Sequence, residues 1–474
     1  MNCLLIIPPE IDKKSLYSKT KLNQEGVFPP LGLAYIAAVL KNSGIKVKII
    51  DSLAEKLTEE EVLYKINDNK PDLIGITVLT QQIKTTISIV EKIKKNKLSK
   101  CIALGGPHIH FEHSSVIKNE YVDFCVRGEG EITFKELTEA LIYNDNLSKV
   151  KGITYKDKKD NTIITEDRPF IPNLDDIPFP ARDLLNNSLY NSPISLGGKK
   201  PFTSILATRG CPFGCHFCSL TKMWGHQRRR SVENVLNEIE EVHKKYNIKI
   251  ISFIDDLLVL NKKWAIELCK GICERGLNIK WDCCGRINLM SKELLKEMKK
   301  AGCECIIYGI EFGNQRILDF VGKGFKVEDV PRTISMTNQA KISVKGLFMM
   351  GYPTETKDTL QDTIDLAKKL KMDYIAVSLV APYPGTDLYS YCLEHNLLQN
   401  LPWIDIMQLS FKAIKLKQLS IDDLIKYSNK INWEYMLRFS YIIRMLFKHP
   451  MQIIFFGSKI FMKLILSKKI YNST

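Results

Sequence analysis

The chain alternates short β-rich runs with amphipathic stretches, and this alternation constrains the fold more than any other feature of the sequence. Within residues 1–142 the β-rich runs are CLLIIPP, KVKIIDS, DLIGITVLT, KCIALGG and VDFCVRG, and stretches with helical periodicity such as LGLAYIAAVLKNSG lie between them. Strands that alternate with helices usually lie parallel in one sheet, because each helix provides the crossover. We therefore expect a doubly wound, Rossmann-like α/β domain over residues 1–142.

The carboxyl ends of these predicted strands carry polar residues and tight turns. Thr77 and Thr80 follow the third run, GGPH at 105–108 follows the fourth, and RGEGE at 127–131 follows the fifth. Open parallel sheets bind ligands beyond the carboxyl ends of their strands. This edge is the expected binding face of the first domain.

The pattern changes after this domain. A polar-turned hairpin pattern at 152–168 and a proline-broken stretch, NLDDIPFPARDLL, predict a hairpin and linker over 143–195. Six strand–helix units then predict a partial, TIM-like (β/α)6 barrel over 196–400, with functional residues at the C-terminal strand ends. Residues 401–474 lack the alternation and are expected to be α-helical.

Three cysteines stand at C-x3-C-x2-C spacing directly after the first predicted barrel strand, in CPFGCHFC. Cys211, Cys215 and Cys218 can bind three irons of a [4Fe-4S] cluster and leave the fourth iron open to another ligand. A zinc site is the alternative, but it needs a fourth protein ligand, and the nearest candidate, His216, lies between two of the cysteines. The N-terminus shows no signal-peptide pattern, which favours reduced, metal-binding thiols. The spacing favours an iron–sulfur cluster.

This motif resembles that of the radical S-adenosylmethionine (SAM) superfamily, in which an aromatic residue, here Phe217, precedes the last cysteine. The resemblance implies an enzyme in which the amino and carboxylate groups of SAM chelate the open iron. Electron transfer then releases methionine and a 5′-deoxyadenosyl radical. It also implies that the three cysteines are the catalytic metal ligands, and that the barrel positions SAM and excludes water.

Polar residues at the ends of the later barrel strands match weaker SAM contacts of that superfamily. The resemblance implies that Asp255 and Asp256 lie near the methionine ammonium group and that Glu311 meets the ribose. Arg286 would pair with the carboxylate, and Gly351 in GLFMMGYPTE would lie along the adenine, although the spacing to the following glutamate departs from the commonest form. Structural roles stay open for Asp256 as a helix cap, Arg286 in a surface ion pair and Gly351 in a turn.

A doubly wound domain in front of such a barrel is similar to the cobalamin (B12)-binding class of the superfamily. PPLGLAYIAAVLK, GGPH, RGEGE, LDDIPFPARDLL and APYPGTDLY resemble that class, over roughly residues 1–400. The class includes carbon methyltransferases and the anaerobic cyclase of bacteriochlorophyll biosynthesis. The resemblance implies cobalamin contacts at the ligand edge of the first domain, at Thr77, Thr80, Gly105, Gly106 and Glu129.

One departure concerns the cobalt ligand. Cobalamin domains that replace the lower axial ligand with histidine carry Asp-x-His-x-x-Gly after the first strand, whereas PPEIDKKSLY at 8–17 contains no histidine. A bound cobalamin is therefore expected to lack a histidine ligand, and His108 is expected to be a loop residue near the corrin. Some related domains have lost cobalamin, but we expect this domain to retain it.

The expected chemistry is methyl transfer to an unactivated carbon of a small molecule. Three alternatives remain: oxidative cyclisation or rearrangement of a tetrapyrrole or lipid, methylthiotransfer, and a non-enzymatic iron–sulfur or corrinoid carrier. Methylthiotransfer needs a second cluster, yet the cysteines of the first domain, Cys3, Cys101 and Cys125, all lie within predicted strands. The strand cysteines of the barrel, such as the Cys283–Cys284 pair, are expected to be structural.

Charge and hydropathy bear on partners and location. The net charge is +15, from 68 Lys and Arg against 53 Asp and Glu, but abundant Lys, Ile and Asn indicate a composition bias, and no nucleic acid is expected. No apolar run is long enough to span a bilayer, so we expect a cytoplasmic enzyme. The resemblance to radical SAM enzymes also implies an electron donor such as flavodoxin or ferredoxin. In residues 435–470 apolar side chains alternate with cations. This tail either lies peripherally on the anionic inner face of the membrane or covers the open side of the barrel.

Overall fold

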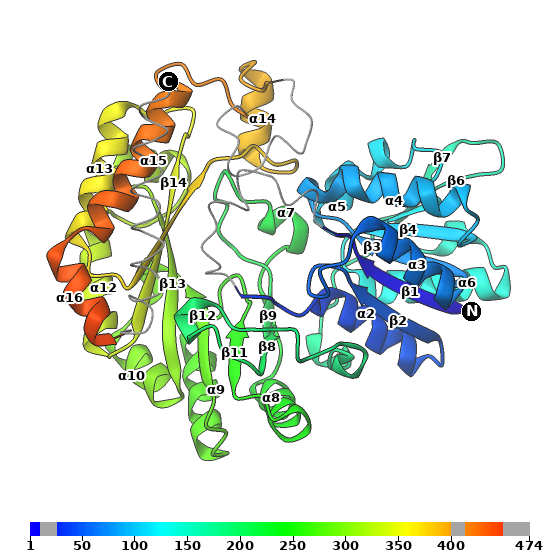
Figure 1. The fold of residues 1–474 in the computed structure, drawn as a ribbon, viewed down its shortest axis with the longest axis horizontal. Coiled ribbons are helices and arrows are strands. Elements are labelled where there is room, and N and C mark those ends of the chain that lie inside the picture. Colours follow the sequence, from blue (N-terminus) through cyan, green and yellow to red (C-terminus); the bar gives the residue numbers. More distant parts are fainter. Residues whose placement is uncertain (10–25, 400–412, 449–474) are drawn as a thin grey trace.

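The computed structural model describes residues 1–9, 26–399 and 413–448, which form two α/β units side by side (Figure 1). A doubly wound sheet is followed by a partial barrel, so the fold class expected from the sequence is confirmed. Within the described ranges, no helix has both the length and the apolar character of a membrane span.

The N-terminal unit is built on a seven-stranded sheet in the order β2-β1-β3-β4-β5-β6-β7. Its strands are β1 (Asn2–Ile7), β2 (Lys46–Asp51), β3 (Leu73–Thr77), β4 (Cys101–Gly105), β5 (Phe124–Val126), β6 (Ile153–Lys156) and β7 (Thr162–Ile164). The first five are parallel. The β6–β7 hairpin forms as predicted, but it pairs antiparallel with β5 and extends the sheet rather than belonging to a separate linker. It satisfies backbone groups that an edge strand would leave unpaired.

Helices cover both faces of this sheet. They are α2 (Leu31–Asn42), α3 (Glu59–Asn69), α4 (Ile83–Lys95), α5 (Pro107–Val116) and α6 (Gly130–Tyr143). Leu33 of α2 and Leu137 of α6 pack on one face, whereas Ile66 of α3 and Ile89 of α4 pack on the other. Strands buried on both faces need apolar residues without alternation, which explains runs such as CLLII in β1.

The second unit is a six-stranded parallel sheet in the order β15-β14-β13-β12-β11-β8. The strands are β8 (Phe202–Ile205), β11 (Ile250–Phe253), β12 (Lys280–Gly285), β13 (Cys303–Glu311), β14 (Ser343–Met350) and β15 (Tyr374–Leu379). The helices are α8 (Val232–Tyr246), α9 (Lys262–Glu274), α10 (Lys292–Lys300), α11 (Gln315–Phe320), α12 (Asp329–Gln339) and α13 (Lys357–Lys369). The end strands β8 and β15 do not pair with each other, so the barrel is open.

Shorter elements complete both units and the connector. They are the antiparallel ribbon of β9 (Thr208–Arg209) and β10 (Arg228–Arg229), helices α7 (Leu220–Trp224) and α14 (Asp387–Glu394), and the 3-10 turns η1 (Thr80–Gln82), η2 (Leu147–Lys149), η3 (Leu174–Asp176), η4 (Arg182–Leu184), η5 (Ile194–Leu196) and η6 (Ile287–Leu289).

The connector is packed between the two units. Tyr190 and Leu196 share a buried cluster with Ala34 of the first unit and Phe202 of the second. The Tyr190 hydroxyl donates a hydrogen bond to Asp51 Oδ2 at 3.0 Å. The connector therefore forms the core of the interface instead of a loose tether.

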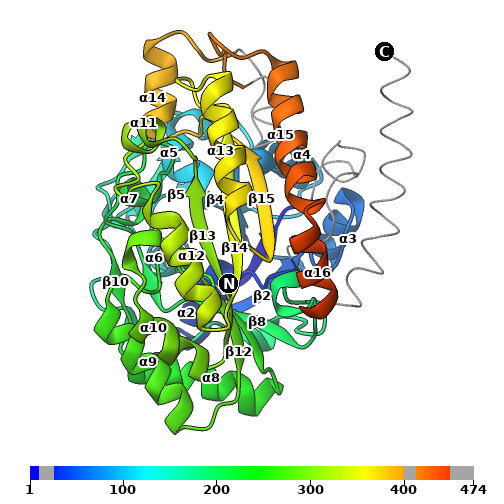
Figure 2. The same cartoon turned by 90° about the vertical axis from the view of Figure 1, so that its left-hand side faces the viewer.

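The C-terminal helices α15 (Ile421–Met436) and α16 (Phe439–Lys448) lie along α13 and the open edge at β15 (Figure 2). Tyr435 is fully buried, and its hydroxyl accepts from the Met372 amide at 2.9 Å and donates to the Met372 carbonyl. Helix α15 thus covers one side of the barrel. Residues 449–470 of the predicted amphipathic tail lie outside the described residues.

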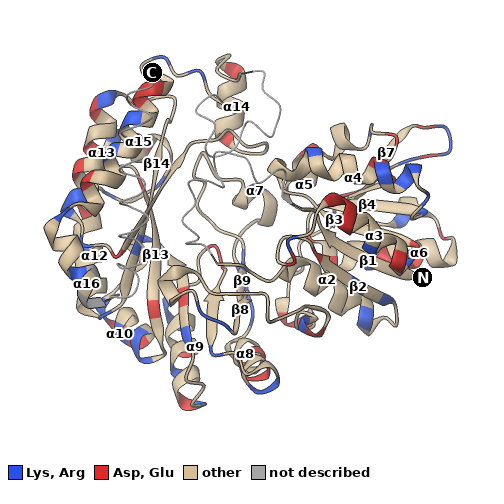
Figure 3. Cartoon of the chain, viewed as in Figure 1, with Lys and Arg blue, Asp and Glu red and all other residues tan. Residues whose placement is uncertain are grey.

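Charged residues of both signs are interspersed along the helices of both units (Figure 3). Several form pairs one helical turn apart, as between Lys95 and Glu91 or Lys244 and Glu240. Positive and negative residues are therefore mixed along these helices.

Candidate active site

The iron–sulfur loop, defined here as residues 210–219, leaves strand β9 at the carboxyl end of β8. Its first residue, Gly210, has φ of +93°, and a Cβ at that position would lie 2.7 Å from the carbonyl oxygens of both Gly225 and His226. Only glycine fits this turn without strain. The loop therefore begins at a fixed point of the β9–β10 ribbon.

Backbone hydrogen bonds hold the iron–sulfur loop to the rest of the barrel. The His216 amide donates to the Val321 carbonyl at 3.0 Å, and the His216 carbonyl accepts from the Leu388 amide at 2.8 Å. Thr221 Oγ1 donates to the Cys211 carbonyl at 3.2 Å. The loop is thus anchored through its main chain, and of its thiols Cys215 Sγ donates weakly to the Gly322 carbonyl at 3.8 Å, a contact that metal binding would replace.

The three cysteines of this loop are free thiols. Burial raises the pKa of Cys211, and it raises the pKa of Cys218 to about 11. Metal binding displaces such thiol protons, because the thiolate is the ligand. In the described ranges no three His, Cys, Asp or Glu side chains converge closely enough to share one metal ion. A [4Fe-4S] cluster does not need this, since each thiolate binds a different iron.

The two aspartates after β11 have different surroundings. Asp255 is fully buried and accepts from the amides of Ala207, at 3.0 Å, and Thr208. Burial raises its pKa to about 7. Asp256 is half-buried, accepts from the Gly210 amide, and acts electrostatically on the pKa of Cys211. Asp255 thus secures the strand that leads into the iron–sulfur loop, and Asp256 is the aspartate that lies beside the cysteines.

Arg286, at the end of β12, places a buried positive charge against the iron–sulfur loop. Its Cζ lies 3.6 Å from the centre of the Phe213 ring, and Nε donates to Asn288 Oδ1 at 3.2 Å. Its Nη2 is buried with no hydrogen-bond partner among the described residues. A buried guanidinium with a free N–H is poised to bind an anionic ligand group. The surface ion pair considered as its alternative role is absent at this described position.

Glu311 is paired with a lysine that sequence reasoning missed. Lys323 Nζ lies 3.0 Å from Glu311 Oε1, and both side chains are almost fully buried. Lys323 Nζ also lies 5.8 Å from the centre of the Phe217 ring. The Gly-Lys-Gly sequence at 322–324, a charge between two glycines, was the available signal. Glu311 itself adopts φ of +67°, a strained conformation typical of functional sites.

Gly351 lies at the end of β14 with φ of +92°. Glu355 Oε2 accepts from the amides of Gly351, at 2.7 Å, and Tyr352, at 2.8 Å, and burial raises the pKa of Glu355 to about 8. Leu424 of α15 lies 3.4 Å from the position of a Cβ on Gly351. The Gly351 turn is therefore fixed by Glu355 and covered on one side by the C-terminal region.

Four of the five predicted cobalamin contacts gather at the carboxyl edge of the N-terminal sheet. Gly106 has φ of +94°, and a Cβ there would lie 2.8 Å from Thr77 Oγ1. Gly105 ends β4 beside it, and Thr80 Oγ1 lies 3.3 Å from Nδ1 of the buried His108. Burial lowers the pKa of His108 to about 4, so its ring is neutral near pH 7.

Glu129, the fifth predicted contact, is engaged elsewhere. Its Oε1 accepts from Arg209 at 2.8 Å, and its Oε2 accepts from Arg228 at 2.9 Å and from the Ile171 amide at 2.6 Å. Both carboxylate oxygens therefore bind the connector and the second unit. These contacts place Glu129 at the interface between the units, because the barrel supplies two arginines opposite the turn.

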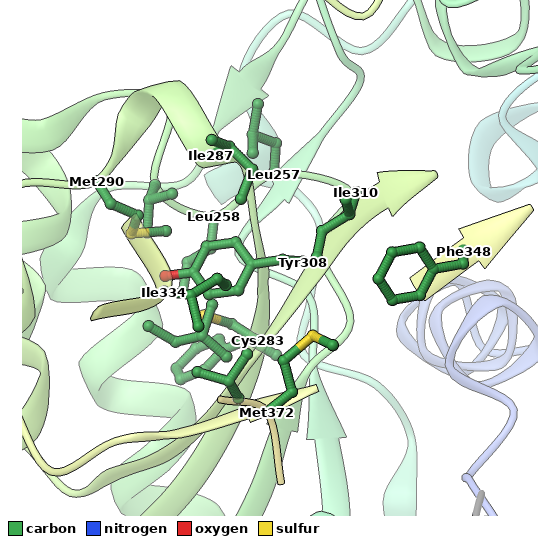
Figure 4. Close-up of a cluster of buried hydrophobic side chains, with 14 of the residues drawn as sticks. Leu257, Leu258, Cys283, Ile287, Met290, Tyr308, Ile310, Ile334, Phe348 and Met372 are labelled. Carbon is green, nitrogen blue, oxygen red and sulfur yellow. The ribbon is translucent and has the colours of Figure 1, made fainter. Parts of the chain in front are cut away.

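The remaining cysteines lie mostly in the core. Cys283 is buried among apolar side chains that include Tyr308 and Met372 (Figure 4). Cys303 Sγ contacts the Cys305 carbonyl oxygen at 3.7 Å. In the first unit, Cys3 and Cys125 are fully buried in two different clusters on opposite faces of the sheet. Their positions suit small apolar residues.

These features fit the cofactors that the sequence implies. Three free thiols on an anchored loop suit a [4Fe-4S] cluster, and the unpartnered N–H of Arg286 beside that loop suits the carboxylate of SAM. The Gly105–Gly106 turn and Thr77 lie together at the carboxyl edge of the parallel sheet, the edge at which such sheets bind large ligands such as cobalamin.

Comparisons with known proteins agree with this geometry. The B12 binding domain family matches residues 19–138, and the Radical SAM superfamily matches residues 205–367. The chain is 35% identical to an uncharacterized methyltransferase of Pyrococcus horikoshii over 95% of each chain. It is 30% identical to the anaerobic magnesium-protoporphyrin IX monomethyl ester cyclase of Rubrivivax gelatinosus, over 77% of this chain and 66% of that protein.

Solved structures share the two-unit fold. The radical SAM methyltransferase TsrM from Kitasatospora setae aligns with a TM-score of 0.68 at 17% identity, covering 83% of this chain and 75% of that one. The cobalamin-dependent radical enzyme OxsB aligns with a TM-score of 0.64 at 19% identity, covering 91% and 62%. The resemblance inferred from the sequence motifs is confirmed: the chain belongs to the cobalamin-binding class of the radical SAM superfamily, and it is an enzyme whose cofactors are a [4Fe-4S] cluster, SAM and cobalamin.

Proposed function

We propose that the reaction is transfer of a methyl group to an unactivated carbon of a small molecule. The observation that carries this proposal is the pairing of an anchored three-cysteine loop with a cobalamin-type sheet edge in one chain. Relatives named as methyltransferases support it, including the Pyrococcus horikoshii protein and a cytidylyl-2-hydroxyethylphosphonate methyltransferase of Streptomyces wedmorensis at 26% identity. When bound, SAM and the cluster supply a radical that can remove a hydrogen atom, and cobalamin supplies a methyl carrier.

The residues of the chain hold and orient these groups. Cys211, Cys215 and Cys218 would bind the cluster, while Arg286 would pair with the SAM carboxylate. Asp256, beside the cysteines, would accept from the SAM ammonium group. The roles of Arg286 and Asp256 follow from their position beside the iron–sulfur loop, where their charges can pair with the carboxylate and the ammonium group of SAM.

Phe217, Glu311 and Gly351 complete the proposed SAM pocket. Glu311 would meet the ribose while Lys323 balances its charge, and Phe217 packs near that pair. The backbone at Gly351 would lie along the adenine. Thr77, Thr80, Gly105 and Gly106 would form the cobalamin side of the site. Enclosure between the two units would keep water from the radical.

Replacement of one cluster ligand tests the cluster assignment. In anaerobically purified, reconstituted protein, Cys218→Ser should lower iron content and abolish reductant-dependent release of 5′-deoxyadenosine from SAM. Cys273→Ser is the matched control, because Cys273 is an exposed thiol on α9. A Cys218→Ser protein that kept both its iron and the release would refute the assignment.

Cobalt coordination tests the cobalamin assignment. The loop that lacks Asp-x-His-x-x-Gly spans 8–17, of which residues 10–17 lie outside the described residues. We expect electron paramagnetic resonance of the cobalt(II) form to show no nitrogen superhyperfine splitting from a lower axial base. Such splitting would contradict the histidine-free coordination, and failure to take up cobalamin would contradict binding itself.

Oxidative cyclisation or rearrangement of a tetrapyrrole or lipid is the second candidate. The observation that favours it is the 30% identity to the Rubrivivax gelatinosus cyclase. Mass spectrometry of a substrate identified from gene neighbours separates the two candidates. Methylation adds one methylene unit to the product, whereas cyclisation removes hydrogen.

We also propose that the reducing electron comes from flavodoxin or ferredoxin, since reductive cleavage of SAM consumes one low-potential electron. Reduced flavodoxin and reduced ferredoxin should each be tested with the holoenzyme for 5′-deoxyadenosine release. Dithionite serves as the positive control. Release with dithionite but with neither protein would contradict this partner.

Helix α16 supports a peripheral position at an anionic membrane. Leu437 and Phe439 at its start, and Ile442, Ile443 and Leu446 along it, are exposed. The cations do not all face outward, however. Arg438 donates to the carbonyls of Lys368 and Leu370, and Arg444 donates to the carbonyl of Met372. The apolar face, rather than these two arginines, would meet the lipid.

Liposome co-sedimentation tests this position. Full-length protein should bind phosphatidylserine-containing vesicles, and Phe439→Ser should weaken binding. The matched control is Tyr64→Ser, which changes an equally exposed aromatic residue on α3. Absence of co-sedimentation at low salt, where electrostatic attraction is strongest, would refute the membrane proposal.

A further inference from the structure

The RGEGE turn after β5 is not explained by the cofactor sites. Sequence reasoning placed it at the cobalamin edge, but Glu129 and Glu131 are only 4% and 5% exposed and face the second unit. Arg209 Nη1 lies 2.8 Å from Glu129 Oε1, and its Nη2 lies 2.6 Å from Glu131 Oε1. Two carboxylates of the first unit therefore hold one guanidinium of the second, and this arginine stands two residues before Cys211.

A second arginine extends the same contact. Arg228 Nη1 donates to Glu129 Oε1 at 3.0 Å, to Glu129 Oε2 at 2.9 Å and to the Ile171 carbonyl at 2.7 Å. Arg228 is on β10, and it pairs directly with Arg209 of β9 in the ribbon that carries the iron–sulfur loop. Both strands of the ribbon are thus held by the first unit.

The charges of this group balance. Burial by itself lowers the pKa of Arg209, but the charges of Glu131 and Glu129 outweigh that effect, and the net pKa is raised. Two glutamates face two arginines in a region where water is largely excluded. Removing one member of such a group leaves an uncompensated buried charge, which is strongly destabilising.

The turn that presents the glutamates is itself fixed. Arg127 donates to Asp167 Oδ1 at 2.7 Å and to the Ile153 carbonyl at 2.6 Å, both in or after the β6–β7 hairpin. The Gly128 amide donates to His110 Nδ1 at 3.1 Å. The position of the turn is therefore set by the N-terminal sheet and by α5, the helix that follows the proposed cobalamin edge.

We propose that Glu129, Glu131, Arg209 and Arg228, here named the interdomain clamp, are positioning residues that fix the iron–sulfur loop relative to the cobalamin-binding sheet. Arg209 is separated from Cys211 only by Gly210, whose backbone is confined by close contacts. Displacement of Arg209 would therefore be passed to the first cluster ligand. Asp255 holds the same segment from inside the barrel through the Ala207 and Thr208 amides, so the clamp supplies the second, external constraint.

The consequence concerns the separation of the two cofactors. This inference rests on the proposed function, in which a methyl carrier and a radical source act on one substrate. A displacement of about 1 Å between reacting groups can cost roughly a hundredfold in rate. The clamp connects the turn after β5 to the strand before the iron–sulfur loop. It therefore fixes the distance between the two cofactor sites in the folded protein.

Amide hydrogen exchange on the full-length, cluster-reconstituted protein tests the clamp. Glu129→Gln and Glu131→Gln should each accelerate exchange of the amides in 209–218 by about tenfold or more, because the segment opens locally. The matched control is Asp373→Asn. Asp373 is a fully buried carboxylate directly before β15, at the opposite edge of the barrel sheet from β8, where it pairs with Arg444 and accepts from the Val344 amide at 2.9 Å.

The comparison among these variants decides the matter. Equal acceleration within 209–218 in Asp373→Asn, or none in the two clamp variants, would overturn the proposal. If Glu129→Gln does not fold, Glu131→Gln and the charge-conserving Arg209→Lys carry the test, because Lys cannot bind two carboxylates through a planar fork. Exchange is measured without cobalamin. It therefore tests the clamp independently of whether the protein transfers a methyl group.

A second readout measures geometry directly. In protein loaded with cobalt(II) cobalamin and a reduced cluster, dipolar coupling between the two paramagnets reports their separation. The clamp predicts a broader distance distribution in Arg209→Lys than in the wild-type protein, and an unchanged one in Asp373→Asn. Identical distributions in all three proteins would overturn the clamp as a positioning device.

Discussion

At the scale of single residues, the buried charges divide into those that the protein satisfies and those it leaves for a ligand. Asp255 and Glu129 each have their hydrogen bonds met by neighbours in the chain. Arg286, 7% exposed, retains a buried N–H with no partner in the described structure. Native proteins rarely leave such a group unpaired, so we expect this N–H of Arg286 to bind a ligand.

The unpaired guanidinium leads to a binding prediction. Arg286→Met should weaken SAM binding to the reconstituted enzyme by roughly thirtyfold, because a hydrogen bond to a charged group contributes about 2 kcal/mol. Isothermal titration under anaerobic conditions measures the affinity. Arg275→Met is the control, since Arg275 lies on the outer surface and pairs with Glu233. Unchanged SAM affinity in Arg286→Met would contradict the assignment.

His108 leads to a prediction about pH. Burial lowers its pKa from 6.5 to about 4, so the folded state binds this proton more weakly than the unfolded state. The contribution of His108 to the unfolding free energy is therefore fully present above pH 6.5 and is lost as the pH falls towards 4. The loss amounts to about 3 kcal/mol. His108→Gln does not titrate, and it should flatten that part of the pH profile of the unfolding free energy.

Denaturant unfolding at several pH values between 4 and 7 measures this effect. His395→Gln, at an exposed position after α14, is the control and should leave the profile unchanged. An equally steep acid loss of stability in His108→Gln and the wild-type protein would show that another group is responsible.

At the scale of elements, local signals in the sequence fix where helices begin. Five helices begin after a Ser or Thr whose hydroxyl accepts a hydrogen bond from the amide three residues later. These N-cap residues are Thr58 of α3, Ser231 of α8, Ser291 of α10, Thr356 of α13 and Ser420 of α15. Glycines fix turns in a similar way at the carboxyl edge of the N-terminal sheet, where the backbone comes close to a neighbouring strand. Gly106 is the clearest case, because both its φ and its surroundings exclude a side chain.

Two glycine substitutions separate these effects. Gly106→Ala should lower the unfolding free energy by about 3 kcal/mol, since a Cβ would meet Thr77 Oγ1 at 2.8 Å in addition to the strain of φ at +94°. Gly44→Ala has φ of +73° but no atom within 4 Å of the added Cβ, so it should cost about 1 kcal/mol. Denaturant titrations measure both values, and equal costs would contradict the packing argument.

At the scale of the whole molecule, the connector and the interdomain clamp join the two units into one body. The connector contributes Tyr190 and Leu196 to a cluster that includes residues of both sheets. The clamp adds buried ion pairs on another part of the interface. Interfaces between domains that are large and partly apolar couple their unfolding.

A core substitution at this interface tests the coupling. Phe202 is fully buried in the connector cluster, and Phe202→Ala should cost about 4 kcal/mol while leaving a single calorimetric transition. Tyr64→Ala, at an exposed site on α3, is the control and should have little effect. Two separate transitions, with only one of them shifted by Phe202→Ala, would show that the units unfold independently.

The sequence by itself determined the features that depend on neighbours along the chain. Strand and helix periodicity predicted both sheets, the spacing of Cys211, Cys215 and Cys218 indicated the cluster and SAM, and the motifs of the first domain indicated cobalamin. These signals are local, because a strand, a helix or a metal-binding loop is built within a few residues. The individual roles of the site residues remain predictions.

Only the tertiary structure decided which side chains meet across long separations. Glu129 and Arg209 lie 80 positions apart, and the hairpin that extends the first sheet was placed with the linker from sequence alone. Lys323 pairs with Glu311 because the segment after α11 folds back against the iron–sulfur loop. Such partners are selected by packing and by the need to neutralise buried charge, and neither is encoded in the local pattern around one residue.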